Sequence, residues 1–438
     1  MDAGGGPTTR DTIFALASGR GRAGVAIVRV SGPDACQALQ ALTRGKPSNE
    51  RQVLYRTLFG KTNEAVIDSG VILRFAAPRS YTGEDVVEFQ IHGGPAIVSS
   101  LLTELGCLKG LRLAEPGEFT RRAVENGRLD LAQAEAIADL VEAETEAQQR
   151  QAVQQYQGGL SKIYESWRSR LIRCAAWIEA TIDFPDEEIP PEALTGSRNE
   201  ISRIANEMQS HLDDGRRGEI LREGFHVAVI GPPNAGKSSL VNALAQRDVA
   251  IVSDMPGTTR DVLEVRLNLK GYPVILSDTA GLREAQDPIE EEGVRRAKER
   301  AAAADLRLLV LDSAAGSGDG LRGDVEVHSK ADLVGDRSHA GLWISAKTGE
   351  GLSELVDLLA AHARDRMEVG DAPVLSRARH RTAVDKARTH LRDALGASAP
   401  ELSAEHMRLA LREIGRLTGR VDLDELLDVV FRDFCLGK

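Results

Sequence analysis

Hydrophobic and polar positions alternate over short stretches in the first part of the chain. Residues 11–30 predict a strand, a Gly/Arg-rich loop and a second strand, and residues 80–89 predict a turn followed by a strand. Helices are expected at 96–105 and after Pro116. This mixture predicts an N-terminal α+β domain over residues 1–127.

From Leu129 to Val153 the apolar period lengthens to that of a helix. The residues that form this apolar stripe are Leu131, Ala134, Ile137, Ala138 and Val141. Further helices are expected from about 160 to 182 and 197 to 221, and again at 379–395, 404–415 and 424–431. The helical segments flank a region of strands and helices, so we expect a discontinuous helical domain, 128–221 and 374–438, with an inserted α/β domain, 222–373.

Composition is that of a multidomain globular protein. The chain has 438 residues, of which 42% are hydrophobic and 28% charged. It contains no run of about 18 apolar residues and no recognisable leader, which predicts a cytoplasmic protein with no membrane segment. The four cysteines lack CxxC spacing and indicate neither a zinc site nor a disulfide framework.

The net charge of −11 argues against a protein that coats nucleic acid through bulk electrostatics. Local contact with RNA stays open, because arginines recur in three short clusters; solvated faces are the ordinary interpretation of such clusters. The clusters are Arg20, Arg22 and Arg29; Arg121 and Arg122; and Arg377, Arg379 and Arg381. No RNA-binding module is recognisable in the sequence.

The inserted domain opens with an apolar run at 225–230 and then Gly-Pro-Pro-Asn-Ala-Gly-Lys-Ser. Strand, glycine-rich turn and helix in this order predict a P-loop, in which Lys237 reaches the β- and γ-phosphates and Ser238 ligates Mg²⁺. A glycine-rich turn that only caps a helix is the alternative. The candidate nucleotide-binding residues here are Asn234, Ala235, Gly236, Lys237, Ser238 and Ser239.

Downstream motifs identify the nucleotide. Asp278-Thr279-Ala280-Gly281 follows a predicted strand at 273–276, and Thr259 supplies a second Mg²⁺-sensing hydroxyl in the loop Gly257-Thr258-Thr259. After a strand at 306–311, Ser329-Lys330-Ala331-Asp332 and Ser345-Ala346-Lys347 stand at the positions of the base-reading motifs of GTPases. Asp332 would accept hydrogen bonds from guanine N1 and N2, which predicts GTP as the ligand.

Ser329 departs from the Asn-Lys-x-Asp pattern of GTPases. Serine is too short to bridge the base and the P-loop as asparagine does, which predicts weaker GTP binding with the preference for guanine retained. The stretch 313–327 is also short and glycine-rich, so we expect that edge of the sheet to be poorly covered.

These motifs, together with YTGEDVVE, HGG, PGEFTRRA, NGRLDLAQAEAIADL, DTAGLRE and the terminal CLGK, resemble the MnmE (TrmE) family of tRNA-modification GTPases nearly end to end. The resemblance implies a folate-binding domain that forms a homodimer, a helical domain and a GTPase domain. It implies an FAD-dependent partner, MnmG, in a heterotetramer or larger complex. That complex places an aminomethyl or carboxymethylaminomethyl group on C5 of the wobble uridine of certain tRNAs, with a 5-formyl- or methylene-tetrahydrofolate as one-carbon source.

The resemblance also assigns residues. Folate contacts fall on Arg29, Glu88, Arg128 and Lys438; the family often has lysine at the position of Arg128. Cys435 is the candidate reactive thiol, with a structural role as the alternative. A K⁺ ion replaces an arginine finger, with ligands from Asn234 and from backbone oxygens near Ser253, Met255 and Thr258. Asp254, Pro256 and Gly257 of the same loop are further candidate nucleotide-binding residues.

Leu282 stands where a Ras-like enzyme has its water-orienting glutamine, and the resemblance gives that task to Glu284. Pairing of two GTPase domains across the dimer would order the loop. Asn234 as a helix N-cap or turn residue, and Glu284 as a solvated switch residue, are the ordinary alternatives.

Two other functions remain open from the sequence. A ribosome-assembly GTPase shares the same nucleotide motifs but needs a KH or second GTPase domain, which is not recognisable here. A folate- or partner-binding scaffold with a decayed GTPase is suggested by Ser329, although Lys237, Ser238, Asp278 and Glu284 argue against it.

Overall fold

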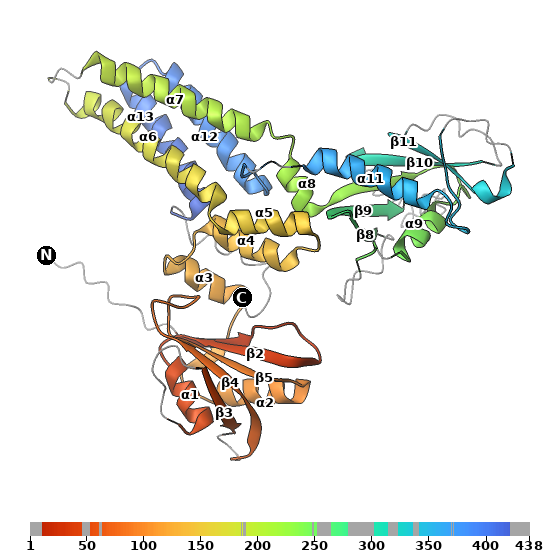
Figure 1. Cartoon of the computed structure of the whole chain (residues 1–438). Coiled ribbons are helices and arrows are strands. Elements are labelled where there is room, and N and C mark those ends of the chain that lie inside the picture. Colours follow the sequence, from red (N-terminus) through yellow and green to blue (C-terminus); the bar gives the residue numbers. More distant parts are fainter. Residues whose placement is uncertain are drawn as a thin grey trace, which may run out of the picture. The chain divides into compact units, whose positions relative to one another are not determined.

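The computed structural model describes residues 11–45, 53–60, 64–184, 186, 190–247, 249–251, 264–278, 302–313, 323–335, 341–368, 370 and 372–420. The chain divides into two compact units, Met1–Ala138 with Ile414–Lys438, and Asp139–Glu413, whose elements are drawn in Figure 1. Within the described part of the chain, no helix combines the length and apolar character needed to cross a membrane.

The first unit is built on a six-stranded sheet with the order β3-β4-β5-β2-β1-β6. Neighbouring strands are antiparallel except β1 and β6, which are parallel. The strands are β1 (Thr12–Leu16), β2 (Ala23–Ser31), β3 (Val53–Phe59), β4 (Val66–Phe75), β5 (Val86–Gly93) and β6 (Leu111–Leu113). Helices α1 (Ala35–Thr43) and α2 (Pro95–Gly106) share one apolar core with this sheet. The predicted α+β character and the helix near 96–105 are confirmed.

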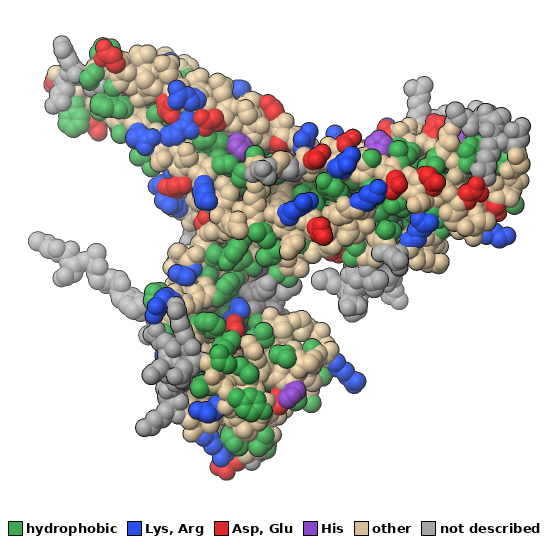
Figure 2. Space-filling model, viewed as in Figure 1, with side chains coloured by type: hydrophobic (Ala, Val, Ile, Leu, Met, Phe, Trp, Pro, Cys, Tyr) green, Lys and Arg blue, Asp and Glu red, His purple; other side chains and the backbone are tan. Residues whose placement is uncertain are grey.

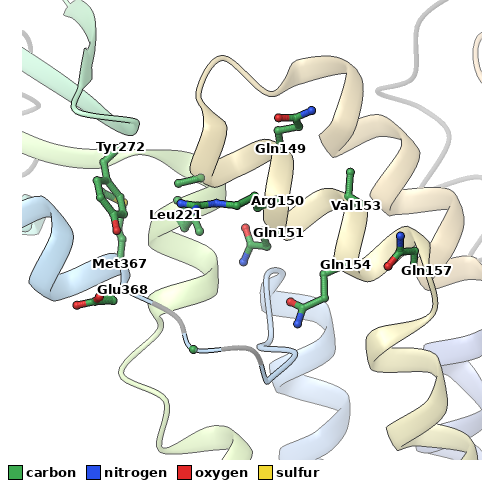
Figure 3. Close-up of a pocket in the computed structure, with 12 residues that line it drawn as sticks. Gln149, Arg150, Gln151, Val153, Gln154, Gln157, Leu221, Tyr272, Met367 and Glu368 are labelled. Carbon is green, nitrogen blue, oxygen red and sulfur yellow. The ribbon is translucent and has the colours of Figure 1, made fainter.

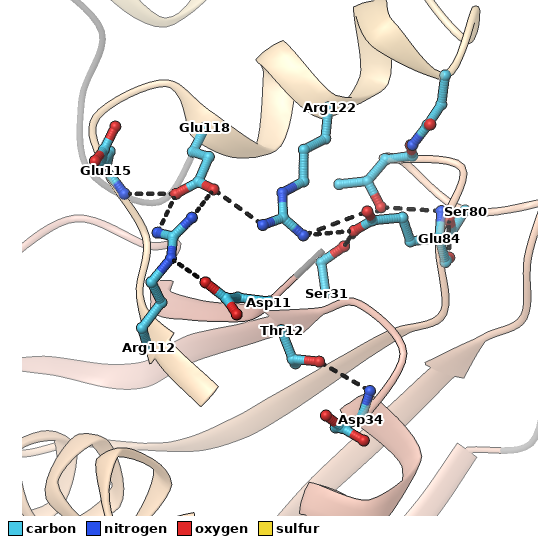
Figure 4. A network of polar contacts seen from close by, with 12 residues as sticks. Asp11, Thr12, Ser31, Asp34, Ser80, Glu84, Arg112, Glu115, Glu118 and Arg122 are labelled. Atoms are coloured by element: carbon cyan, nitrogen blue, oxygen red, sulfur yellow. Dashed lines mark hydrogen bonds and ion pairs between the residues drawn. The ribbon is translucent and has the colours of Figure 1, made fainter. Parts of the chain in front are cut away.

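Helix α3 (Glu118–Glu125) is attached to this unit by a buried ion network (Figure 4). Arg122, 4% exposed, donates to Glu84 Oε2 at 3.1 Å and to Glu118 Oε1 at 3.0 Å. Burial alone would raise the pKa of Glu118, but donors from Arg112, the Glu115 backbone and Arg122 lower it overall. Loss of either carboxylate would leave Arg122 buried with an incompletely paired charge, which would destabilise the fold. Because Glu118 is the first residue of α3, this network fixes where the helix begins.

The helical part of the second unit joins segments that are far apart in sequence. Its helices are α5 (Glu146–Tyr156), α6 (Gly159–Asp183), α7 (Pro191–Leu212), α8 (Arg217–Glu223), α12 (Ala378–Gly396) and most of α13 (Pro400–Thr418). Helix α12 lies beside α7 in Figure 1, and Arg381 on α12 pairs with Asp214 at 2.6 Å and Glu219 at 2.7 Å. The predicted return of the chain to one helical body is confirmed.

Two predicted helices are each interrupted. The segment predicted as helical from Leu129 to Val153 forms α4 (Leu131–Glu142) and α5, because Thr145 makes a capping box with Gln148 that starts a new helix. The helix predicted at 197–221 ends at Leu212, and α8 begins only after Gly215 and Arg216 adopt positive φ. The helix predicted at 424–431 lies outside the described residues.

The inserted domain contains a second six-stranded sheet with the order β12-β11-β10-β7-β9-β8. The strands are β7 (Phe225–Ile230), β8 (Glu264–Leu269), β9 (Tyr272–Asp278), β10 (Leu306–Asp312), β11 (Val325–Ser329) and β12 (Leu342–Trp343). All described neighbours are parallel except β8 and β9. This confirms the predicted mostly parallel α/β sheet and its strands at 225–230, 273–276 and 306–311. Most of 313–327 lies outside the described residues.

Hydrogen bonds join α5 to α8 and to the inserted domain. Gln151 Nε2 donates to the carbonyl of Gly218 at 3.1 Å, and the amide of Ala147 donates to the carbonyl of Gly271 at 3.2 Å. A Cβ on Gly218 would lie 2.4 Å from the carbonyl oxygen of Leu375. Helix α5 therefore contacts both α8 and the turn between β8 and β9.

Candidate functional site

The P-loop runs from the end of β7 to the start of α9 (Lys237–Ala245). Gly231 has a φ of 150°, and a Cβ there would lie 2.2 Å from the carbonyl oxygen of Val310, so the loop passes directly over β10. Gly236, with a φ of 90°, is the N-cap of α9. Asn234 is exposed with a φ of 64° and is not the cap, so the helix-cap alternative for Asn234 is wrong, whereas the turn-residue alternative stays open.

The side chain of Lys237 is buried within the P-loop. Its side chain is 8% exposed, and Nζ donates to the carbonyl oxygens of Gly231 and Pro232, both at 2.9 Å. Burial lowers the pKa of Lys237, and the negative charge of Asp278 at the end of β9 partly opposes this. The loop thus positions a buried cation beside a carboxylate, as phosphate and Mg²⁺ binding requires.

Ser329 ends β11 against the P-loop. Its hydroxyl donates to the carbonyl oxygen of Ala235 at 2.6 Å and lies 3.0 Å from that of Leu311. The expectation that serine is too short to reach the P-loop is wrong, because β11 and the loop come close enough for a short side chain to connect them. That Ser329 makes no hydrogen bond to the base, as asparagine would, stays a prediction.

Ser345 of the second base-reading motif orients Asp332 of the first. Ser345, fully buried, donates to Asp332 Oδ1 at 2.6 Å, and this hydrogen bond holds the pKa of Asp332 below its ordinary value. Asp332 is exposed, so its carboxylate is charged and open to a ligand. Lys330 has a φ of 57° and pairs with Asp312 at the end of β10, 2.6 Å away. The structure therefore brings Asn234, Lys237, Asp278, Ser329 and Asp332 to the carboxyl edge of one parallel sheet.

Several predicted site residues lie outside the described residues. In the nucleotide-binding set these are Ser253, Asp254, Met255, Pro256, Gly257, Thr258, Thr259, Thr279, Ala280, Gly281 and Glu284. The predicted folate contact Lys438 and the candidate thiol Cys435 also lie outside them.

Two predicted folate contacts meet on the first sheet. Arg29 on β2 stands opposite Glu88 on β5, and its Nε lies 2.9 Å from Glu88 Oε1. The Arg29 guanidinium also lies over the rings of Tyr81 and Phe119, at 4.9 and 5.6 Å from their centroids. Arg128 is exposed, and its Cγ would lie 3.2 Å from a Cβ on Gly83, two residues along from Tyr81. These residues thus gather around the loop 81–83.

A cavity of about 610 Å³, which no sequence motif predicted, lies on the other side of the inserted domain (Figure 3). Residues of α5, among them Gln149, Arg150 and Gln154, line it together with Tyr272 and Met367. Tyr272 begins β9 whereas Asp278 ends it, so this cavity and the P-loop lie at opposite ends of the strand. The repeated glutamines of 148–157 are the sequence signal that could have indicated it.

Most arginines of the three sequence clusters form ion pairs within the protein. Arg121 pairs with Glu125 at 3.1 Å, and Arg377 donates to Asp139 at 2.5 Å. Arg122 and Arg381 take part in the networks described above, whereas Arg20 and Arg22 are exposed. On the face shown in Figure 2, acidic and basic side chains are interspersed over the Asp139–Glu413 unit.

We expect Ser329→Asn to tighten GTP binding about fivefold, worth about 1 kcal/mol for one added hydrogen bond to the base. The amide of asparagine can still donate to the Ala235 carbonyl, which Ser329 contacts now. Ser329→Ala is the matched control and should weaken binding, because the Ala235 carbonyl loses its donor. Fluorescent-nucleotide titration measures both; an unchanged dissociation constant in Ser329→Asn would show that another residue already contacts the base.

Comparisons with known proteins agree with this architecture. The family model described as MnmE helical domain matches residues 131–435, and that described as GTP-binding protein TrmE N-terminus matches residues 12–128. The tRNA modification GTPase MnmE of Parvibaculum lavamentivorans is 52% identical, with 98% of this chain and 100% of that protein covered. The protein of the same name from Rhodospirillum rubrum is 51% identical with the same coverage.

Among solved structures, the G domain of the T. maritima FeoB iron transporter is 27% identical and covers 32% of this chain and 98% of that chain, with a TM-score of 0.23. That score is low, so the assignment depends on the family models and the full-length relatives. Since these relatives are about half identical over nearly the whole length, the chain belongs to the MnmE family of tRNA modification GTPases.

Proposed function

We propose that this protein hydrolyses GTP and uses that cycle to modify the wobble uridine, position 34, of certain tRNAs. The observation that carries the GTP assignment is the exposed Asp332 carboxylate, held by Ser345 at the same sheet edge as the P-loop. Membership of the MnmE family supports tRNA as the molecule that is modified. Such a reaction would take place in the cytoplasm.

The nucleotide site divides the work among a few groups. Lys237 would bind the β- and γ-phosphate oxygens, exchanging the loop carbonyls for anionic partners. Ser238 and Thr259, with Asp278 nearby, would hold Mg²⁺, which supplies charge neutralisation on the phosphates. Glu284 would orient the attacking water.

A K⁺ ion would complete the site between Asn234 and the loop of Ser253, Met255 and Thr258. The exposed position of Asn234 at the tip of the P-loop, free of a capping role, fits a cation ligand. The ion would supply positive charge where an arginine finger acts in other GTPases.

The partners follow the family pattern. We propose a homodimer that joins an FAD-dependent MnmG-type protein in a heterotetramer or larger assembly and forms the 5-carboxymethylaminomethyl or aminomethyl group. A tetrahydrofolate derivative, 5-formyl or methylene, would bind by Arg29, Glu88, Arg128 and Lys438. The fixed Arg29–Glu88 pair supports a preorganised pocket. Cys435 would be a reactive thiol in this reaction.

We expect GTP hydrolysis to require K⁺, with Rb⁺ as a substitute and Na⁺ inactive, because Na⁺ is too small for oxygens spaced for K⁺. Steady-state phosphate release in KCl, RbCl and NaCl at matched ionic strength measures this. Equal rates in the three salts would contradict the cation site. Tight GTP binding without turnover in any salt would instead favour a scaffold whose GTPase has decayed.

A further inference from the structure

A second cluster of ligating groups lies far along the chain from the P-loop, where α12 and α13 pack together. His390 and Asp393 are three residues apart on α12 and therefore share a face of that helix, and His406 belongs to α13. One ligand atom from each of these three residues lies within 4.8 Å of the other two. All three belong to the Asp139–Glu413 unit.

Both imidazoles of this cluster lack a partner at one nitrogen. The Nδ1 atoms of His390 and His406 are buried and, among the described residues, accept or donate no hydrogen bond. Buried polar nitrogens are normally paired, so two orphans in one cluster need an explanation. The rings stand 5.8 Å apart, and His406 Nδ1 lies 4.0 Å from Asp393 Oδ2, too far for a hydrogen bond.

Solvent can reach the cluster, and the charge of Arg408, two residues from His406, is paired with other carboxylates. Arg408 pairs with Glu179 and Glu405, both at 2.8 Å. The side chains of Asp393 and His406 are 51% and 31% exposed, which gives an ion a route from solvent and leaves room for a water ligand.

We propose that His390, Asp393 and His406 form a binding site for a transition-metal ion, with Zn²⁺ the best match. Two imidazoles, a carboxylate and a water make a tetrahedral N₂O₂ set that suits Zn²⁺. Metal–ligand distances of about 2.0–2.2 Å place tetrahedral ligand atoms about 3.4 Å from one another. The ligand atoms of this cluster lie within 4.8 Å, so the side chains must turn toward the ion to bind it. Because α12 and α13 are separated by residues 397–399 alone, the ion would lock this helical hairpin.

The test is titration of the nucleotide-free full-length protein with Co²⁺, in excess Mg²⁺ and a non-thiol reductant, followed by visible absorption. We expect one equivalent to give a tetrahedral Co²⁺ spectrum without a thiolate charge-transfer band, and Zn²⁺ to displace it. His390→Gln and His406→Gln should each weaken Zn²⁺ binding by at least about tenfold, since even outer-sphere partners contribute about that much.

His92→Gln is the matched control: His92 pairs with Asp68 at 2.9 Å but has no second imidazole in a described cluster, so affinity should not change. Asp393→Asn, at an exposed carboxylate, gives the same test if a histidine variant fails to fold, as judged by circular dichroism. Absent binding, wild-type affinity in the cluster variants, or a thiolate band that assigns the ion to cysteines would each overturn the site.

Discussion

Asp332→Asn should change this protein from a GTPase into one that prefers xanthosine triphosphate. The Asp332 carboxylate is held by Ser345 and would accept hydrogen bonds from the two donors of guanine, N1 and N2. An asparagine amide would instead donate to the C2 carbonyl of xanthine, which replaces the N2 amino group of guanine. We expect the ratio of kcat/KM for GTP to that for XTP to fall by about 100-fold or more, since a site built to hydrogen-bond one partner rejects its mismatch strongly. Competition between the two nucleotides measures this ratio.

Ser345→Ala is the control for that experiment. The carboxylate loses the hydroxyl that orients it but keeps its charge, so GTP binding should weaken while the preference over XTP persists. An unchanged GTP-to-XTP ratio in Asp332→Asn would mean that this carboxylate does not contact the base.

Lys237→Met should separate activity from stability. We expect kcat to fall by about 10²–10³-fold, the usual loss when one preorganised charge is removed from the transition state. The nucleotide-free protein should keep its stability within about 1 kcal/mol, because the buried ammonium gains only two loop carbonyls there, and burial disfavours its charge. Phosphate release and chemical denaturation are the two measurements.

Lys237→Arg tests whether the site needs the shape of the lysine side chain as well as its charge. It keeps the charge but not the compact ammonium that fits between the carbonyls of Gly231 and Pro232, so activity should stay low. Large destabilisation of the nucleotide-free Met variant would contradict the account, since it would make Lys237 a structural residue.

Local patterns predicted the features that depend on neighbouring residues. The strand at 225–230, the glycine turn and the helix from Lys237 follow from apolar runs and turn chemistry, and the structure has all three. The base-reading motifs could be placed by their order after the predicted strand at 306–311. In the structure the first ends β11 and the second follows β12, and these parallel strands bring their carboxyl ends to one edge.

Features that depend on distant contacts could not be predicted. The bond from Ser329 to Ala235 depends on how closely β11 approaches the P-loop, which no spacing reveals. Arg122 appeared as a candidate for RNA contact, yet Glu84 and Glu118 surround it in the fold. The break at Thr145 does have a local signal, the capping-box pair of Thr145 and Gln148, which lies just beyond the apolar stripe that ends at Val141.

Mass analysis of the wobble uridines of tRNA tests the central claim most directly. Cells that lack this protein should carry uridine 34 without its aminomethyl-type group at C5, and the wild-type gene should restore the group. The Lys237→Met variant, expressed to the same level, should fail to restore it. Normal modification in the deleted strain, or full restoration by Lys237→Met, would contradict a role for GTP hydrolysis by this chain in wobble-uridine modification.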